Sequence, residues 1–164
     1  MISILSPAKK LNFDRMTRNC ESSQPVFKKE AAKLAAIASK LNTIELSKLM
    51  KISSNLAQLN KERFDQFLET PSSSQSKQAA FAFAGDTYVG LSVKEIIPDH
   101  DTFFQNNIRI LSGIYGILRP FDLIQPHRLE MGSKLVNDKG SNLYEFWSDS
   151  LTKYLETELE THKD

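Results

Sequence analysis

A mostly apolar stretch, residues 108–124, is broken by Gly113 and Gly116, and no other feature restricts the fold of this chain as much. Two glycines so close together allow a turn within a few residues, because glycine has no Cβ and adopts backbone conformations closed to other residues. The pattern predicts two apolar segments joined by a tight hairpin. We interpret residues 101–124 as a helix-hairpin-helix element, with Asp101 as the N-cap of its first helix.

Apolar residues between positions 25 and 69 recur at helical spacing. Phe27, Ala31 and Leu34 are three or four residues apart, which puts them on one face of a helix. Pro25 suits an early helical position, because its missing N–H would have no partner there. The same spacing continues further along the chain, so we predict a helical subregion over about 25–69.

Two short apolar runs are typical of β-strands. Residues 2–5 and 79–84 are each followed by turn-forming residues, and the second run alternates alanine with phenylalanine. A regular apolar stripe predicts a last helix over 142–160. Together with the helices expected at 101–124, these elements predict an α+β fold in which a mixed sheet packs against several helices.

The composition indicates one globular domain. Of the 164 residues, 40% are hydrophobic and 25% are charged, and glycine and proline are few. Cys20 is the single cysteine, so an intramolecular disulfide and a multi-cysteine metal site are excluded. A reducing compartment is the default for such a chain. We expect no metal and no cofactor.

The first residues carry neither a basic segment nor a long apolar core, so they do not resemble a secretory signal. No apolar run approaches the length of about 18 residues that suggests a membrane span. These observations predict a cytoplasmic protein with no membrane partner.

Charge is unevenly distributed along the chain. The formal net charge is only +1, which argues against a protein covered in positive charge. Basic residues outnumber acidic ones in residues 1–70, whereas acidic residues outnumber basic ones in residues 141–164. Basic surface is therefore expected to be local, and the acidic end is not expected to face nucleic acid.

The hairpin is the first candidate for a binding site. In a helix-hairpin-helix element, the hairpin glycines let backbone N–H groups approach a DNA phosphate, and such contacts do not depend on base sequence. We therefore expect binding to double-stranded or distorted DNA through phosphate contacts. The alternative is that the glycines only turn two packed segments. The candidate DNA-binding residues are Lys9, Lys10, Arg109, Gly113, Tyr115, Gly116, Arg119 and Arg128.

A second hypothesis is an enzyme acting on a small phosphorylated or nucleotide-like ligand. Asp86 and Lys9 each follow a predicted strand, a common place for ligand-binding residues, and Arg128 lies two residues from Glu130. Asp86 and Glu130 are the possible ligand-pocket residues of this hypothesis. A turn-forming aspartate, a solvated loop and ordinary ion pairs explain the same residues. No nucleophile elbow, P-loop or pair of metal-binding histidines is present in the sequence, so we assign no catalytic residue and expect a binding protein.

Four blocks of sequence, in this order and spacing, resemble the YaaA family of peroxide-stress proteins. The blocks are ILSPAK at 4–9, FAGDTYVGL at 83–91, LSGIYGILRPFDLIQPHRLEMG at 111–132 and LYEFW at 143–147. The resemblance implies a cytosolic protein of the response to hydrogen peroxide that limits damage from intracellular iron. It also implies a helix-hairpin-helix beside a positively charged cleft.

The chain departs from that family in two respects. His127 stands where family members usually have tyrosine, which keeps an aromatic hydrogen-bonding ring but makes its charge dependent on pH. Family members also continue well beyond this length. We therefore expect residues 1–164 to be the N-terminal portion of a single YaaA-like domain and an incomplete fold. A third reading follows, in which this portion is a scaffold for the remainder of the domain.

Overall fold

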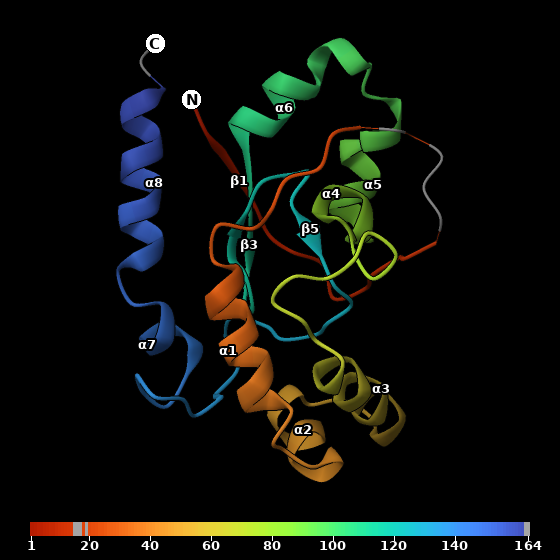
Figure 1. The fold of residues 1–164 in the computed structure, drawn as a ribbon, viewed down its shortest axis with the longest axis vertical. Coiled ribbons are helices and arrows are strands. Elements are labelled where there is room, and N and C mark those ends of the chain that lie inside the picture. The colour runs from red at the N-terminus through yellow and green to blue at the C-terminus, as the bar shows by residue number, and fades with distance from the viewer. Residues whose placement is uncertain (15–17, 19, 163–164) are drawn as a thin grey trace.

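The computed structural model describes all residues except 15–17, 19 and 163–164, and a small mixed sheet lies at its centre (Figure 1). Strand β1 (Ser3–Leu5) runs parallel to β3 (Ile108–Ser112), and β3 runs antiparallel to β4 (Gly116–Leu118). The strand order is therefore β1-β3-β4, with Ser3 opposite Ile108. Because β1 and β3 are parallel, both end at the same edge of the sheet.

Helices α1 (Lys28–Ala38), α2 (Thr43–Met50) and α3 (Ser54–Asp65) form a helical group beside this sheet. Asn42 begins α2 with a capping box, in which its side chain accepts from Glu45 N and the Glu45 carboxylate accepts from Asn42 N. Their apolar faces meet in one core. Its fully buried members include Ala31, Leu34, Ala38, Leu46 and Ala57.

The residues between the helical group and β3 form short elements. Strand β2 (Lys77–Gln78) pairs antiparallel with β5 (Leu123–Ile124) and leads directly into α4 (Ala79–Ala82). The strand predicted for residues 79–84 is therefore wrong, because Ala79–Ala82 form a short helix. Short apolar runs do not distinguish a buried strand from a buried helix, and these residues are buried all round. The chain continues through α5 (Asp86–Leu91), two 3₁₀ turns (Val93–Glu95 and Pro98–His100) and α6 (Asp101–Asn107).

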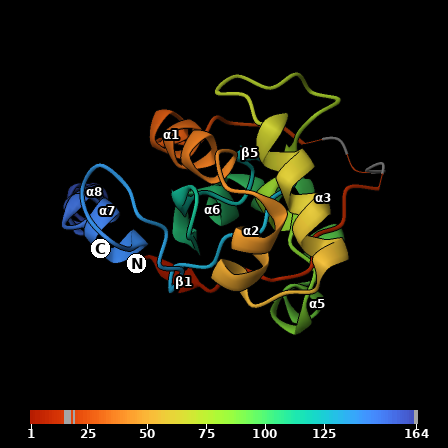
Figure 2. The ribbon, with the colours of Figure 1, turned by 90° about the horizontal axis from the view of Figure 1, so that it is seen from below.

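The helix predicted for 142–160 is divided in two. Helix α7 (Leu143–Trp147) ends at Ser148, whose φ of 44° is incompatible with a right-handed helix, and α8 (Ser150–Thr161) follows. Seen from below, α7 and α8 lie on one side of the molecule and α3 and α5 on the other (Figure 2). Phe27, the residue before α1, links that helix to α7, since its ring packs 5.4 Å from Trp147, centroid to centroid.

The helix-hairpin-helix predicted for 101–124 is wrong. Helix α6 ends at Asn107, and the residues on either side of the turn are antiparallel strands, β3 and β4, so the glycines belong to a β-hairpin. Ile108, Ile110 and Ile117 are β-branched and favour strands. Burial on both faces of the hairpin hides the alternation that would have indicated strands in the sequence.

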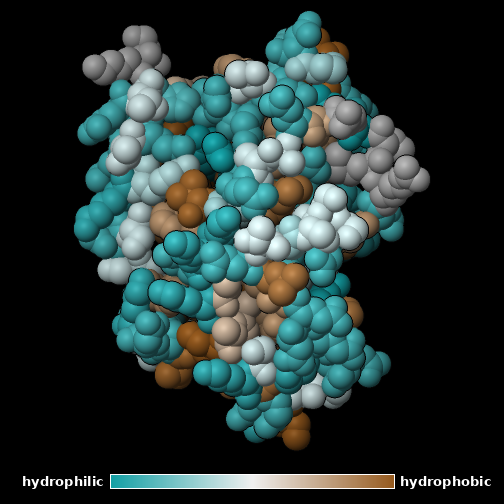
Figure 3. Space-filling model, viewed as in Figure 1, coloured by the Kyte–Doolittle hydropathy of each residue, from teal (hydrophilic) through white to brown (hydrophobic). Residues whose placement is uncertain are grey.

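The predicted α+β class, with a mixed sheet packed against several helices, is confirmed. The face seen in Figure 1 is mostly hydrophilic, and its hydrophobic residues lie in small separate patches (Figure 3). In the part of the chain that the structure describes, every helix is too short or too polar to cross a membrane.

Candidate anion-binding groove

A groove of about 290 Å³ lies where β1 and β3 end. The residues just after β1, Pro7 to Lys9, line one wall, and Ser112 and Gly113 at the end of β3 lie beside them. Segment 127–132 forms the other wall, and Phe83 completes the lining. The carboxyl ends of parallel strands are a frequent place for ligand binding in proteins that contain both helices and sheets.

Gly113 positions segment 127–132. A Cβ atom at this residue would lie 2.2 Å from the Leu129 carbonyl oxygen and 2.9 Å from Met131 N, so only glycine allows this contact between backbones. The Gly113 carbonyl oxygen accepts a hydrogen bond of 2.9 Å from Trp147 Nε1. Gly113 therefore joins the groove wall to β3 and to α7, and its backbone faces protein on these sides.

Three charged side chains meet in the groove. Glu130 Oε1 lies 3.4 Å from Lys9 Nζ and 3.8 Å from an Arg128 Nη2 atom, so one exposed carboxylate is shared between two cations. The second distance is too long for a good hydrogen bond. Arg128 Nε is buried and has no partner among the described residues. The Arg128 guanidinium is thus held loosely and keeps free donors.

A smaller hollow of about 150 Å³ continues the groove beyond Arg128 and Glu130. Lys51, Leu49 and Met50, at the end of α2, line it together with Gly132 and Ser133. Lys51 adopts a left-handed backbone conformation, with φ of 53°, as the C-cap residue of α2. Among the described residues that line the combined groove, the only carboxylate is that of Glu130, whereas Lys9, Lys51 and Arg128 are cations. The groove therefore has a net positive charge.

His127 lies in the groove wall as a neutral ring. Its pKa is lowered to about 4, chiefly because the ring is buried; the hydrogen bond to Gln125 opposes this shift, and the charge of Arg63 adds to it. Nδ1 lies 2.8 Å from the Gln125 carbonyl oxygen, which can only accept, so Nδ1 carries the hydrogen and Nε2 keeps its lone pair. The ring packs edge-on against Tyr115, 5.3 Å away. It can accept a hydrogen bond but does not supply charge at neutral pH.

Four of the predicted DNA-binding residues are buried in the structure. Arg109 is only 3% exposed and forms an ion pair with Glu158. Tyr115 accepts from Gln125 N through its hydroxyl, and burial raises the pKa of that phenol. Gly116 has a φ of +70°, and a Cβ there would lie 2.7 Å from Leu151. Gly113 contacts the groove wall, as described above.

The other predicted residues differ in their accessibility. Arg119 is half-buried, lies 3.3 Å from the buried Asp122 carboxylate and donates to Gln24 O. Lys10 is exposed beside the groove but does not line it. Asp86 is exposed at the start of α5 and does not line it either. The structure therefore brings together Lys9, Arg128 and Glu130, and leaves Asp86 out.

Sequence reasoning missed Lys51 as a groove residue. It is far from the other groove residues in the sequence, and only the packing of α2 against segment 128–133 brings it there. His127 carried a signal, since it lies in the same short block as Arg128 and Glu130. Among the described residues, no group of three or more His, Cys, Asp and Glu side chains could hold a metal ion.

These features define an α+β protein with a cationic groove at the carboxyl ends of two parallel strands. The family model for peroxide stress protein YaaA matches residues 1–164. The chain belongs to this family, as its sequence blocks predicted.

Similar proteins of known sequence agree with this family. A UPF0246 protein of Roseobacter denitrificans is 45% identical over 161 residues, which is 98% of this chain and 61% of that protein. UPF0246 proteins from two strains of Aliivibrio fischeri, MJ11 and ES114, are each 41% identical over 160 residues, 98% of this chain and 62% of theirs. The chain thus spans about three-fifths of the length of these relatives.

Proposed function

We propose that this chain supplies the groove by which a cytoplasmic peroxide-stress protein binds a small phosphorylated ligand. The observation that carries the proposal is the loosely held Arg128 guanidinium, whose Nε has no hydrogen-bond partner among the described residues and whose ion pair with Glu130 spans 3.8 Å. A guanidinium presents a planar fork of donors that matches phosphate oxygens. The family membership supports the peroxide-stress setting.

The neighbouring groups fit the same ligand. Lys9 and Lys51 add positive charge on either side of Arg128, and lysine binds phosphate as a point charge. Glu130 holds Lys9 and Arg128 near each other in the free protein, and a phosphate would replace it as the partner of Arg128. His127 Nε2 can accept a hydrogen bond from a ligand hydroxyl. The geometry supports binding, and no step of bond breaking is assigned.

Replacing Arg128 with Gln should weaken the binding of inorganic pyrophosphate about tenfold or more, because hydrogen bonds between charged groups contribute about 1.5–3 kcal/mol. Isothermal titration calorimetry measures the affinity. Lys33→Gln is the matched control, since it removes one positive charge from an exposed position on α1. Equal affinity of wild type and Arg128→Gln, or no binding by wild type, would refute the proposal.

DNA is the second candidate ligand, and it is favoured by the exposure of Lys9, which lines the groove, and of Lys10, the next residue in the chain. These side chains could contact successive phosphates without reading base sequence. Such binding would place a peroxide-stress protein on DNA, where it could limit iron-dependent oxidative damage. This candidate relies on the loop after β1, because most of the hairpin residues are buried.

The double replacement of Lys9 and Lys10 with Gln distinguishes the two candidates. If DNA is the ligand, the slope of log affinity against log salt for a duplex oligonucleotide should become shallower by about 2, one counterion for each phosphate contact. Fluorescence anisotropy of a labelled duplex measures this slope. Arg119→Gln should change it little, since Arg119 is already paired with Asp122. If the protein binds pyrophosphate but not a DNA duplex, DNA is rejected as the ligand and the small phosphorylated ligand is retained.

A further inference from the structure

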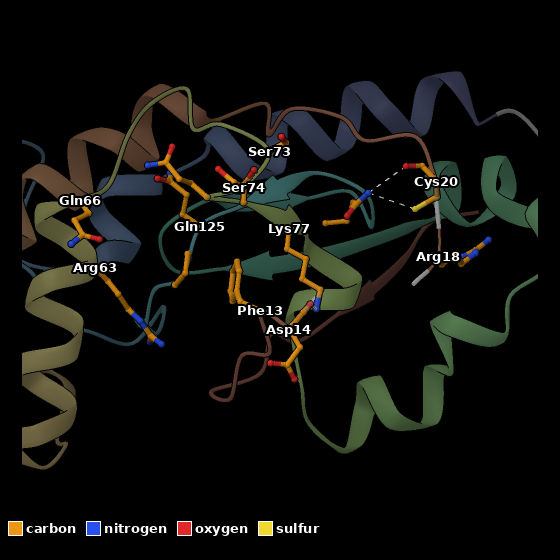
Figure 4. A pocket seen from close by; sticks show the side chains of 14 residues that line it. Phe13, Asp14, Arg18, Cys20, Arg63, Gln66, Ser73, Ser74, Lys77 and Gln125 are labelled. Atoms are coloured by element: carbon orange, nitrogen blue, oxygen red, sulfur yellow. Dashed lines mark hydrogen bonds between the residues drawn. The ribbon is translucent and has the colours of Figure 1, made fainter. Parts of the chain in front are cut away.

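A second, larger hollow of about 620 Å³ lies apart from the groove. Segment 125–128 separates the two, since Gln125 and Pro126 line this hollow whereas His127 and Arg128 line the groove. In Figure 4, Arg63 of α3 and Gln66, which caps that helix, lie at one end of the hollow, and Arg18 and Cys20 lie at the other. Its volume is within the range of small-molecule binding sites, about 300–1,000 Å³.

The cations of this hollow are not equally available. Arg18 forms an ion pair with Asp101 and donates to the Val93 carbonyl oxygen. Lys77 Nζ donates to the backbone carbonyl oxygens of Asn12, at 2.9 Å, and of Asp14, at 3.0 Å. Both side chains therefore hold neighbouring segments in place.

Arg63 is the cation without such a role. Among the described residues it has neither an ion pair nor a hydrogen bond, although it is half-buried. Burial lowers the pKa of its guanidinium, but an arginine remains charged at neutral pH. A partly desolvated cation with no counter-charge attracts an anion more strongly than an exposed one, because solvent screens it less.

The remaining lining is suited to an organic ligand. Ser73, Ser74 and Ser76 contribute hydroxyl groups from one loop. The Ser76 hydroxyl donates to Ser72 O at 2.8 Å and Ser74 Oγ lies 2.9 Å from Ser72 Oγ, so these two would bind a ligand mainly as acceptors or by exchanging a partner. The base of this loop is fixed, since the Gln125 side chain accepts from Leu68 N at 3.0 Å and donates to Leu68 O at 2.7 Å. The apolar surfaces in the lining belong to Phe13 and Pro126.

We propose that this hollow is a second binding site, for a small phosphorylated organic molecule of nucleotide size, with Arg63 as the residue that binds its phosphate groups. Phe13 and Pro126 contact the apolar part of the ligand, and the serine hydroxyls hydrogen-bond its polar groups. The site is distinct from the groove of Arg128. It does not depend on the function proposed for that groove.

Cys20 provides a direct reporter, because it is the only cysteine of the chain and lines this hollow. A bound ligand should slow the alkylation of Cys20 by iodoacetamide. Burial raises the pKa of this thiol, which Arg18 partly opposes and Asp101 reinforces, so the reaction is best followed at mildly alkaline pH. Mass spectrometry of the intact protein gives the rate.

The probes are ATP, GTP and inorganic pyrophosphate, with adenosine as the uncharged control. At least one phosphorylated probe should slow alkylation of the wild type severalfold, and adenosine at the same concentration should not. Arg63→Gln should need a concentration about tenfold higher for half-maximal protection. Lys33→Gln should behave like the wild type, because Lys33 is exposed on α1, away from the hollow.

A second variant tests the same hollow if Arg63→Gln fails to fold. Ser74→Asp adds a negative charge to an exposed lining residue, so it should also weaken protection. Unfolding would show itself as faster alkylation without any probe. The proposal is overturned if no phosphorylated probe protects Cys20, or if protection is the same in the wild type and in folded Arg63→Gln and Ser74→Asp.

Discussion

Replacing Gly113 with Val should lower the free energy of unfolding by about 3 kcal/mol, at the upper end of the usual cost of overpacking, and should abolish binding in the groove. The new side chain would begin 2.2 Å from the Leu129 carbonyl oxygen and 2.8 Å from the Glu130 carbonyl carbon. Backbone atoms cannot rotate away as the end of a flexible side chain can. Segment 129–131 must therefore move off β3, and Arg128 and Glu130 move with it.

Urea unfolding followed by the fluorescence of Trp147, the only tryptophan, measures this loss. Gly132→Ala is the matched control, because it lies in the same wall and a Cβ there would meet nothing within 4 Å. It should unfold at nearly the same urea concentration as the wild type. If Gly113→Val were as stable as Gly132→Ala and bound pyrophosphate equally well, the close contact between β3 and the groove wall would be disproved.

Replacing Glu158 with Ala should lower the free energy of unfolding by about 3 kcal/mol at neutral pH. Arg109 is buried, and Glu158 is its only carboxylate partner among the described residues. Removing one member of such a pair leaves a buried charge uncompensated, which costs about 3–5 kcal/mol when both groups are fully buried. The lower end of that range applies here, since the Glu158 side chain is 19% exposed.

The same pair predicts a dependence on pH. Burial acts to raise the pKa of Glu158, but hydrogen bonds from Arg109 and Tyr154 and the charge of Arg109 outweigh it, so the pKa lies below its usual value. The unfolded chain therefore takes up the proton first as the pH falls. The contribution of Glu158 is complete above the ordinary glutamate pKa of about 4.3 and is lost as the pH falls through the lower value in the folded state.

Unfolding in urea at neutral pH and at pH values below 4 tests both statements. The difference in stability between wild type and Glu158→Gln should shrink as the pH falls. The double variant Arg109→Met with Glu158→Leu should be more stable than Glu158→Ala, because it leaves no unpaired charge. A difference that stays constant with pH would show that the ion pair does not determine the stability of this contact.

Local sequence predicted the helical subregion 25–69 from its apolar spacing, although α1 begins at Lys28 and Pro25 lies before it. Phe27, Ala31 and Leu34 belong to the stripe that packs α1 into the core. The spacing of such residues fixes one face of a helix whatever its neighbours are. The end of α7 was different. Ser148 breaks the predicted helix with a positive φ, although serine itself gives no such signal.

The stretch 108–124 shows where local pattern is insufficient. It is buried on all sides, so neither helical nor strand periodicity is visible, and the pairing of β3 with β1 and β4 decides its structure. That outcome changed the role of its two glycines. Because Gly113 has no side chain, the backbone of the groove wall can pack directly against it. In the same way, Gly116 leaves room for the side chains of Trp147 and Leu151.

The candidate sites also combine features that the sequence determines with features that only the tertiary structure determines. The sequence by itself determined the family, the α+β class and the neighbourhood of Arg128 and Glu130, because these depend on residues close together in the chain. Only the tertiary structure decided that Arg109 is buried against Glu158, that Lys9 and Lys51 join Arg128 in one groove, and that Arg63 has no ion pair or hydrogen bond among the described residues. Those facts depend on contacts between residues far apart in sequence, and such contacts are set by how the helices and the sheet pack together.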